Sequence, residues 1–196
     1  VMGVIYVIAS RRQRGIEASV TVGVIALVGA FFAALMLFAQ EADGSYAANP
    51  FEVQAPAPVD GHGLNPLLQD PGMIAHPPTL FVGYAGFTIP FAMVIGGLVS
   101  GAAARRGWML GIRRWTLFSW LLLGIGIVLG AEWAYVELGW GGYWAWDPVE
   151  NASLLPWLTA TALLHSIMAQ QYRGTLKRWN VILIALTFLL CIFGTY

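Results

Sequence analysis

Long apolar stretches alternate with short polar ones along most of this chain. Four of them approach the ~20 residues that an α-helix needs to cross a bilayer, at roughly 20–39, 79–99, 115–136 and 152–169. Shorter apolar runs stand at both ends, over 1–9 and 179–196. The pattern predicts an all-α polytopic membrane protein, a bundle of about four full transmembrane helices with partial spans at both ends. Because both ends fall inside apolar runs, we expect the chain to be a piece of a larger protein.

The charged residues between the apolar stretches are segregated by sign. All ten basic residues fall in three loops, and they are Arg11, Arg12, Arg14, Arg105, Arg106, Arg113, Arg114, Arg173, Lys177 and Arg178. The two intervening loops, at 40–78 and 137–151, carry acids without any basic residue. Basic loops of membrane proteins stay in the cytoplasm. The two acidic loops are therefore predicted to lie on the outer face.

Composition supports a membrane protein and excludes some partners. The chain is 58% hydrophobic and only 10% charged, whereas roughly a quarter of the residues in soluble domains are charged. Its formal net charge of zero offers no general attraction for phosphate backbones, so nucleic acid is not an expected partner. The lone Cys191 lies inside an apolar run and is interpreted as a packing residue.

We predict a single membrane domain over 1–196 with two outer loops. The loop at 40–78 is rich in Pro, Ala and Gly, which indicates extended chain and turns rather than a separate domain. In the span that follows it, Pro90 should kink the helix, because proline has no N–H to donate.

The outer loop at 137–151 is unusually aromatic. Trp140, Trp144 and Trp146 lie within seven positions, together with a tyrosine and Asp147. Tryptophans do anchor helix ends at membrane interfaces, but such a belt needs only one or two aromatics per helix end. The density favours a platform for a large, flat, apolar ligand. Asp147 precedes a proline and could cap the next helix or orient a ligand, and the sequence favours neither role.

Three histidines are candidates for chemistry. His76 precedes two prolines at the outer mouth of the second span, either as an interfacial hydrogen-bonding group or as a metal ligand near the aromatic loop. His165 lies about 20 Å below the outer end of the fourth span, at 1.5 Å per residue. An ionisable group at that depth is a functional-site hypothesis by default, and hydrogen bonding between helices is the alternative. His62, between two glycines, is expected to be exposed.

A flat aromatic surface together with imidazoles points to haem, whose iron takes axial histidine ligands. The outer loops contain no Arg or Lys to pair with haem propionates. Backbone and indole N–H groups and Asn151 would have to serve, or basic groups outside this chain. Nothing in the sequence resembles a nucleophile–base pair, a P-loop or a zinc-ligand cluster, so hydrolysis and phosphoryl transfer are not supported.

Four sequence blocks, in this order, resemble one family. They are Gly-Leu-Asn-Pro-Leu-Leu-Gln-Asp at 63–70, Ala-His-Pro-Pro at 75–78, the tryptophan-rich stretch at 140–157 and Thr-Ala-Leu-Leu-His-Ser at 161–166. The tryptophan-rich stretch is similar to the signature (the WWD domain) of membrane proteins that handle haem in cytochrome c biogenesis. The other blocks narrow the resemblance to the CcmF/NrfE family, over nearly the whole chain. Tyr143 and Ala145 stand where other members often carry Trp and Phe.

The resemblance implies two haem sites. A transient substrate haem would sit on the tryptophan-rich loop outside the membrane, with His76 as the first of two outer iron ligands. His165 matches the first of two intramembrane ligands to a stable haem b. The second ligand of each pair would follow residue 196. The residues that we expect to bind haem are therefore His76, His165, Trp140, Trp144, Trp146 and Asp147.

The resemblance also implies a function, that of a haem lyase in the bacterial inner (plasma) membrane, with the tryptophan-rich loop on the periplasmic side. Such a lyase joins haem vinyl groups to the cysteines of apocytochrome c C-x-x-C-H motifs. Its expected partners are the haem chaperone CcmE, apocytochrome c and CcmH/CcmI-like proteins. The alternative is a haem exporter or delivery protein of the CcmC/CcsA type, which forms no thioether bond. A third interpretation is a structural scaffold whose aromatics form only an interface belt.

Overall fold

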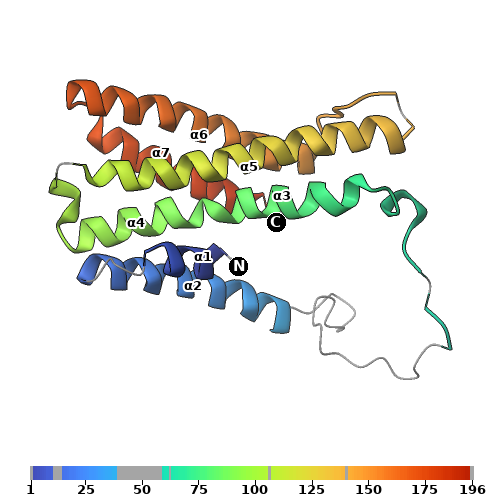
Figure 1. Cartoon of the computed structure of the whole chain (residues 1–196), viewed down its shortest axis with the longest axis horizontal. Helices are drawn as coiled ribbons and strands as arrows, with labels where there is room; N and C mark the ends of the chain where they lie inside the picture. The colour runs from blue at the N-terminus through green and yellow to red at the C-terminus, as the bar shows by residue number, and fades with distance from the viewer. Residues whose placement is uncertain are drawn as a thin grey trace.

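The computed structural model describes residues 2–10, 15–38, 59–61, 63–105, 107–139 and 141–194. Every regular element within them is helical. The α-helices are α1 (Met2–Ala9), α2 (Ile16–Phe38), α3 (Gly72–Gly86), α4 (Thr88–Val99), α5 (Trp108–Glu137), α6 (Pro148–Arg173) and α7 (Lys177–Phe193), with 3₁₀ turns η1 (Pro66–Leu68) and η2 (Ala102–Ala104). The long helices run side by side along the longest axis of the molecule (Figure 1).

Four helical segments in the described part of the chain are long and apolar enough to cross a membrane. The first is α2, the second is the combined α3–α4 segment Gly72–Val99, the third is α5 and the fourth is α6. α1, with eight residues, and α7, with 17, are shorter. The predicted fold class is therefore confirmed: an all-α polytopic membrane protein with about four full spans and shorter helices at both ends.

The segment formed by α3 and α4 is interrupted one turn before Pro90. α3 ends at Gly86, Phe87 lies between the two helices, and α4 begins at Thr88. Pro90 has no N–H to donate to the carbonyl of Gly86, four residues earlier, so the helical ladder lacks a bond at this point. At the break itself, the N–H of Phe87 bonds to the Tyr84 carbonyl three residues earlier, at 3.3 Å. The break lies where the sequence predicts a kink.

The same segment begins earlier than its apolar length predicts. That pattern predicts a start at about residue 79, directly after Pro77 and Pro78. α3 instead begins at Gly72 and contains both prolines. Because proline has no N–H, the carbonyls of residues 73 and 74 lose their usual helical donors, and α3 includes both prolines near its start at the loss of these two bonds. Residues 72–78 of the expected outer loop are thus helical, and His76 lies on a helix.

α5 packs closely against α3 because a glycine on each helix faces the backbone of the other helix. A methyl group at Gly83 of α3 would lie 2.7 Å from Cα of Leu123, and one at Gly126 of α5 would lie 2.6 Å from Cα of Leu80. Small residues of this kind allow membrane helices to approach backbone to backbone. The α3–α5 pair forms the middle of the bundle, with α6 and α7 on one side and α1 and α2 on the other (Figure 1).

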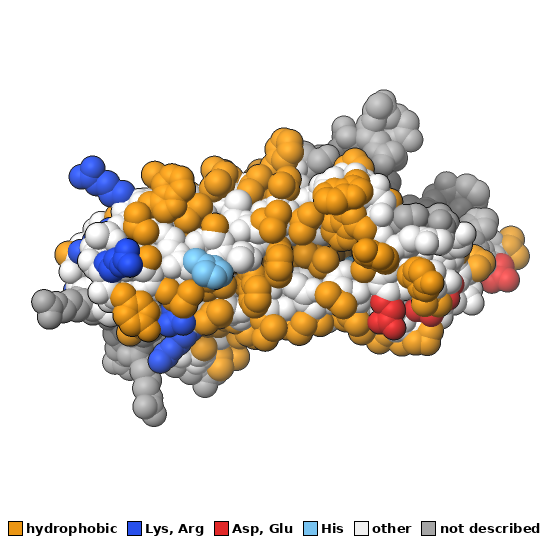
Figure 2. Space-filling model, turned by 90° about the horizontal axis from the view of Figure 1, so that it is seen from above, with side chains coloured by type: hydrophobic (Ala, Val, Ile, Leu, Met, Phe, Trp, Pro, Cys, Tyr) orange, Lys and Arg blue, Asp and Glu red, His pale blue; other side chains and the backbone are white. Residues whose placement is uncertain are grey.

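The charges lie at opposite ends of the bundle. Figure 2 shows Lys and Arg at one end, Asp and Glu at the other, and a broad hydrophobic surface between them. We call these the basic end, where α5 begins and α6 turns into α7, and the acidic end, where α5 ends and α6 begins. The described tryptophans of the 137–151 loop therefore belong to the acidic end.

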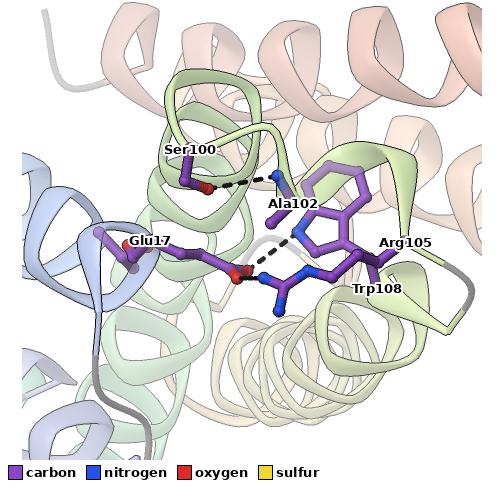
Figure 3. A network of polar contacts seen from close by, with 6 residues as sticks. Glu17, Ser100, Ala102, Arg105 and Trp108 are labelled. Atoms are coloured by element: carbon purple, nitrogen blue, oxygen red, sulfur yellow. Dashed lines mark hydrogen bonds and ion pairs between the residues drawn. The ribbon is translucent and has the colours of Figure 1, made fainter.

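Glu17 is an acid that lies at the basic end. It lies in the first turn of α2. Its carboxylate accepts hydrogen bonds from the guanidinium of Arg105 and, at 3.1 Å, from the indole N–H of Trp108 (Figure 3). Glu17 thereby ties α2 to the turn between α4 and α5. Its partners are 88 and 91 residues away in the sequence, too far for a local pattern to reveal them.

Candidate functional site

Asp147 starts α6 as a helix cap. Its backbone is extended (φ −72°, ψ 166°), its carboxylate accepts the Glu150 N–H at 2.7 Å, and Pro148 occupies the first helical position. A carboxylate here satisfies an otherwise unpaired N–H and faces the positive end of the helix dipole. The capping role left open by the sequence is confirmed, and a role in orienting a ligand stays a prediction.

The first turn of α6 also holds the loop that precedes it. The Glu150 carboxylate accepts the Ala145 N–H at 2.8 Å, and the Asn151 side-chain amide donates to the Trp146 carbonyl at 3.0 Å. These bonds fix the backbone on both sides of Trp146 against the helix. The sequence signal for this brace is the Asp-x-x-Glu spacing of a capping box, although Glu150 reaches back to residue 145 rather than to the cap.

The described part of the aromatic surface contains Tyr143, which is 67% exposed, and two tryptophans, Trp144 and Trp146. The ring centroids of the two tryptophans are 6.0 Å apart and their planes are nearly perpendicular, at 84°. Trp146 is 69% exposed and has a left-handed backbone, with φ +59°. That conformation is costly for a bulky side chain and persists only where the surroundings impose it. Here the hydrogen bonds from Glu150 and Asn151 to the loop backbone impose the conformation, and they hold the Trp146 ring exposed to solvent.

Trp144 is half-buried, and its indole N–H is buried without a hydrogen-bond partner among the described residues. A buried donor of this kind is a natural place for a ligand acceptor to bind. The remaining tryptophan of the predicted set, Trp140, lies outside the described residues, as does His62.

His76 lies between α3 and α5. Its Nδ1 is 2.8 Å from the Gly126 carbonyl oxygen. A carbonyl only accepts, so Nδ1 carries the proton and Nε2 keeps the lone pair that a metal would bind. The ring also covers Gly130, since a methyl group on that glycine would lie 2.5 Å from the ring atom Cε1. The imidazole is thus oriented by a backbone bond and fitted to a glycine gap.

His76 and the tryptophan loop belong to the same end of the bundle. Gly130 is seven residues before the end of α5, which is about 10 Å of helix. At that end, the indole of Trp133 donates to the Leu67 carbonyl at 3.3 Å and packs near Gly72, where α3 begins. The start of α3, the end of α5 and the start of α6 therefore meet at the acidic end (Figure 1).

His165 lies elsewhere, on the outer surface of α6. It is 17 residues beyond Pro148, so it stands about 26 Å along the helix from the acidic end. The side chain is exposed, and Nδ1 is 2.8 Å from the Thr161 carbonyl oxygen. The same reasoning as for His76 leaves the Nε2 lone pair pointing away from its own helix. The structure does not bring His165 together with the tryptophan loop, and the two separate haem sites stay a prediction.

Together these features define a class: a multi-pass helical membrane protein that holds aromatic rings in the open at one end and presents two imidazoles whose Nδ1 atoms are engaged by backbone carbonyls. The chain belongs to the cytochrome C assembly protein family, whose model matches residues 1–196.

The relatives narrow this class. The chain is 47% identical over 175 residues to "Cytochrome c-type biogenesis protein CcmF" of Haemophilus influenzae, covering 89% of this chain and 26% of that protein. It is 44% identical over 192 residues to the CcmF of Escherichia coli, covering 97% and 29%. A solved structure, "Cytochrome c Heme Lyase CcmF", matches 99% of this chain and 29% of that one with 34% identity and a TM-score of 0.76. The chain thus spans about a quarter of the length of the curated relatives it matches.

Proposed function

We propose that this chain is the haem-handling part of a cytochrome c haem lyase. The observation that carries the proposal is the braced loop at the acidic end, where Trp146 is held exposed in a strained conformation near the end of the bundle that also holds His76. The family and the CcmF relatives support the same assignment.

The residues at the acidic end fit a substrate haem. His76 offers Nε2 as an axial ligand to iron, because Nδ1 is already engaged by the Gly126 carbonyl. Trp144 and Trp146 offer ring surfaces, and Trp144 offers an unpaired N–H to a propionate oxygen. Trp140 completes the predicted aromatic set. In this proposal Asp147 acts by positioning, since its carboxylate is engaged in capping α6.

His165 fits a second, resident haem b within the membrane. Its bond to Thr161 fixes the tautomer, and its exposed ring faces away from the described bundle. Such a group would supply a redox-active iron able to exchange single electrons. His165 is the residue of this chain that would hold the group, through Nε2.

The reaction requires little chemistry from the protein itself. In thioether formation, the S–H of an apocytochrome C-x-x-C-H cysteine adds across a haem vinyl group, with sulfur bonding to carbon and the proton completing the other carbon. The nucleophile belongs to the substrate. The share of this chain is to hold the ring still and in the correct orientation for two thiols.

The partners follow from this role. Haem would arrive from the chaperone CcmE, apocytochrome c would supply the thiols, and CcmH/CcmI-like proteins would present it. The chain would lie in the bacterial inner membrane with the acidic end facing the periplasm, as the segregation of charge supports. A haem delivery protein of the CcmC/CcsA type is the alternative function, although the relatives reported above carry the CcmF name.

The proposal is tested with the intact protein that carries this chain. It should mature a C-x-x-C-H reporter cytochrome, and His76→Ala should abolish maturation while the protein still accumulates in the membrane. Covalent haem on the reporter, measured by haem staining after denaturation, distinguishes lyase from delivery. A protein that transfers haem to a soluble acceptor but never yields thioether-linked haem would support the alternative.

A further inference from the structure

The turn between α6 and α7 places three cations on the surface of the basic end. Arg173 is the last residue of α6, and Lys177 and Arg178 are the first two of α7. All three side chains are exposed. The turn is tight, with Gly174 and Leu176 in left-handed conformations (φ +70° and +68°). The three cations therefore lie on one short turn.

No acid of the described chain neutralises these cations. Glu17, the described acid at the basic end, is engaged with Arg105 and Trp108. Among the described residues, the other acids lie in the 59–70 segment, at the end of α5 and at the start of α6, at the acidic end. The three cations of the α6–α7 turn therefore have no carboxylate partner within the described chain.

Two of these cations lie at the N-terminus of a helix, where the helix dipole disfavours positive charge. Lys177 and Arg178 occupy the first turn of α7, which contains no acidic residue and has no side-chain cap. Positive charge at a helix N-terminus is repelled by the dipole. Arg173, at the C-terminus of α6, is favourably placed by the same reasoning. Lys177 and Arg178 therefore do not stabilise α7 itself, and their charges are available to an external anion.

Exposed aromatic and apolar side chains accompany the cations. Tyr172 is 89% exposed, Trp179 52% and Leu176 46%. Tyr and Trp prefer the headgroup level of a membrane, where the ring is in an apolar setting and the polar atom reaches water. A free phosphate ion would use the charges but not these rings, and a phospholipid would use both.

We propose that the α6–α7 turn binds acidic phospholipid headgroups of the leaflet at the basic end. Arg173, Lys177 and Arg178 pair with the lipid phosphates, while Tyr172 and Trp179 lie at the level of the headgroups. This contact anchors the helix that carries His165, and it does not depend on which haem chemistry the protein performs.

The test uses the intact protein in bilayers that contain spin-labelled lipids. Electron paramagnetic resonance gives the relative association constant of phosphatidylglycerol against phosphatidylcholine at the protein surface. The wild type should prefer phosphatidylglycerol, and each of Arg173→Gln, Lys177→Gln and Arg178→Gln should lower the preference, by up to roughly five-fold per charge. Arg105→Gln is the matched control: it removes one charge from the same end, but that charge is already paired with Glu17, so the preference should change little.

Folding and alternative anions are controlled separately. The charge-conserving pair Lys177→Arg and Arg178→Lys should keep the preference, which separates charge loss from unfolding. Equal lipid preference in the wild type and the triple glutamine variant would overturn the proposal. So would an equal effect of Arg105→Gln, or loss of the preference when inorganic phosphate is added at constant ionic strength.

Discussion

The imidazole of His76 covers Gly130, so that a methyl group on this glycine would lie 2.5 Å from Cε1 and 3.0 Å from Nδ1 of the ring. Gly130→Ala should therefore push the ring off the Gly126 carbonyl, and the added methyl group would also crowd the ligand atom Nε2, at 3.1 Å. Loss of an orienting contact of this kind costs about 10–100-fold in metal binding. Titration of the intact protein with haem, followed in the visible spectrum, should show this weakening.

A matched control for that variant lies on α2. At Gly23 an added methyl group meets nothing within 4 Å, so Gly23→Ala should leave haem binding unchanged. Equal haem affinity in the Gly130→Ala and Gly23→Ala proteins would show that the position of His76 does not matter.

Substitution of Asp147 separates its two candidate roles. Asparagine caps a helix about as well as aspartate, whereas alanine loses about 1 kcal/mol of stability. If Asp147 acts only as a cap, Asp147→Asn should retain cytochrome c maturation and Asp147→Ala should lose both activity and thermal stability. Maturation lost in both variants, with stability lost only in Asp147→Ala, would instead assign the carboxylate charge a direct part in ligand binding.

Trp146 should be important for function and dispensable for folding. Its side chain is 69% exposed and its backbone is left-handed, a conformation that glycine adopts without the cost borne by tryptophan. Trp146→Gly should therefore keep or raise the unfolding temperature while sharply reducing haem capture. Tyr135→Leu, at a 61% exposed aromatic near the end of α5, is the control. If Trp146→Gly matures cytochrome c normally, the aromatics form only an interface belt.

Gly83→Ala tests the α3–α5 contact that positions His76. The added methyl group would lie 2.7 Å from Cα of Leu123, and backbone cannot move aside as a flexible side chain can. We expect about 1–3 kcal/mol of destabilisation, seen as a lower unfolding temperature of the intact protein in detergent. Gly29→Ala on α2, where nothing lies within 4 Å, should leave that temperature unchanged.

The sequence predicted what depends on hydropathy and on neighbouring residues. Apolar length located the spans, and the Asp-Pro pair at 147–148 offered the cap of α6 as one of two roles, which the structure confirms. It failed where distant contacts decide. Apolar length placed the start of the second span at residue 79, although α3 begins at Gly72, includes Pro77 and Pro78 and carries His76. Glu17 could not be recognised as a partner of Arg105, 88 residues away.

The conformation of the candidate site was equally hidden from sequence patterns. Nothing in the residues near Trp146 favours a left-handed backbone there, since tryptophan avoids it. The conformation results from Glu150 and Asn151, which fasten the loop to the first turn of α6. A loop pattern can indicate which residues lie in the same loop. The exposure of a particular ring depends on the hydrogen bonds that hold the loop backbone.

In the proposed function, His76 and the tryptophan loop hold one haem at the acidic end, apart from a resident haem at His165. The most direct measurement is the visible and electron paramagnetic resonance spectrum of the haem-loaded intact protein and its His76→Ala and His165→Ala variants. We predict that His76→Ala loses the substrate-haem signal, regains it with added imidazole and keeps the low-spin b-type signal, which His165→Ala alone removes. A substrate-haem spectrum unchanged by His76→Ala would contradict the account.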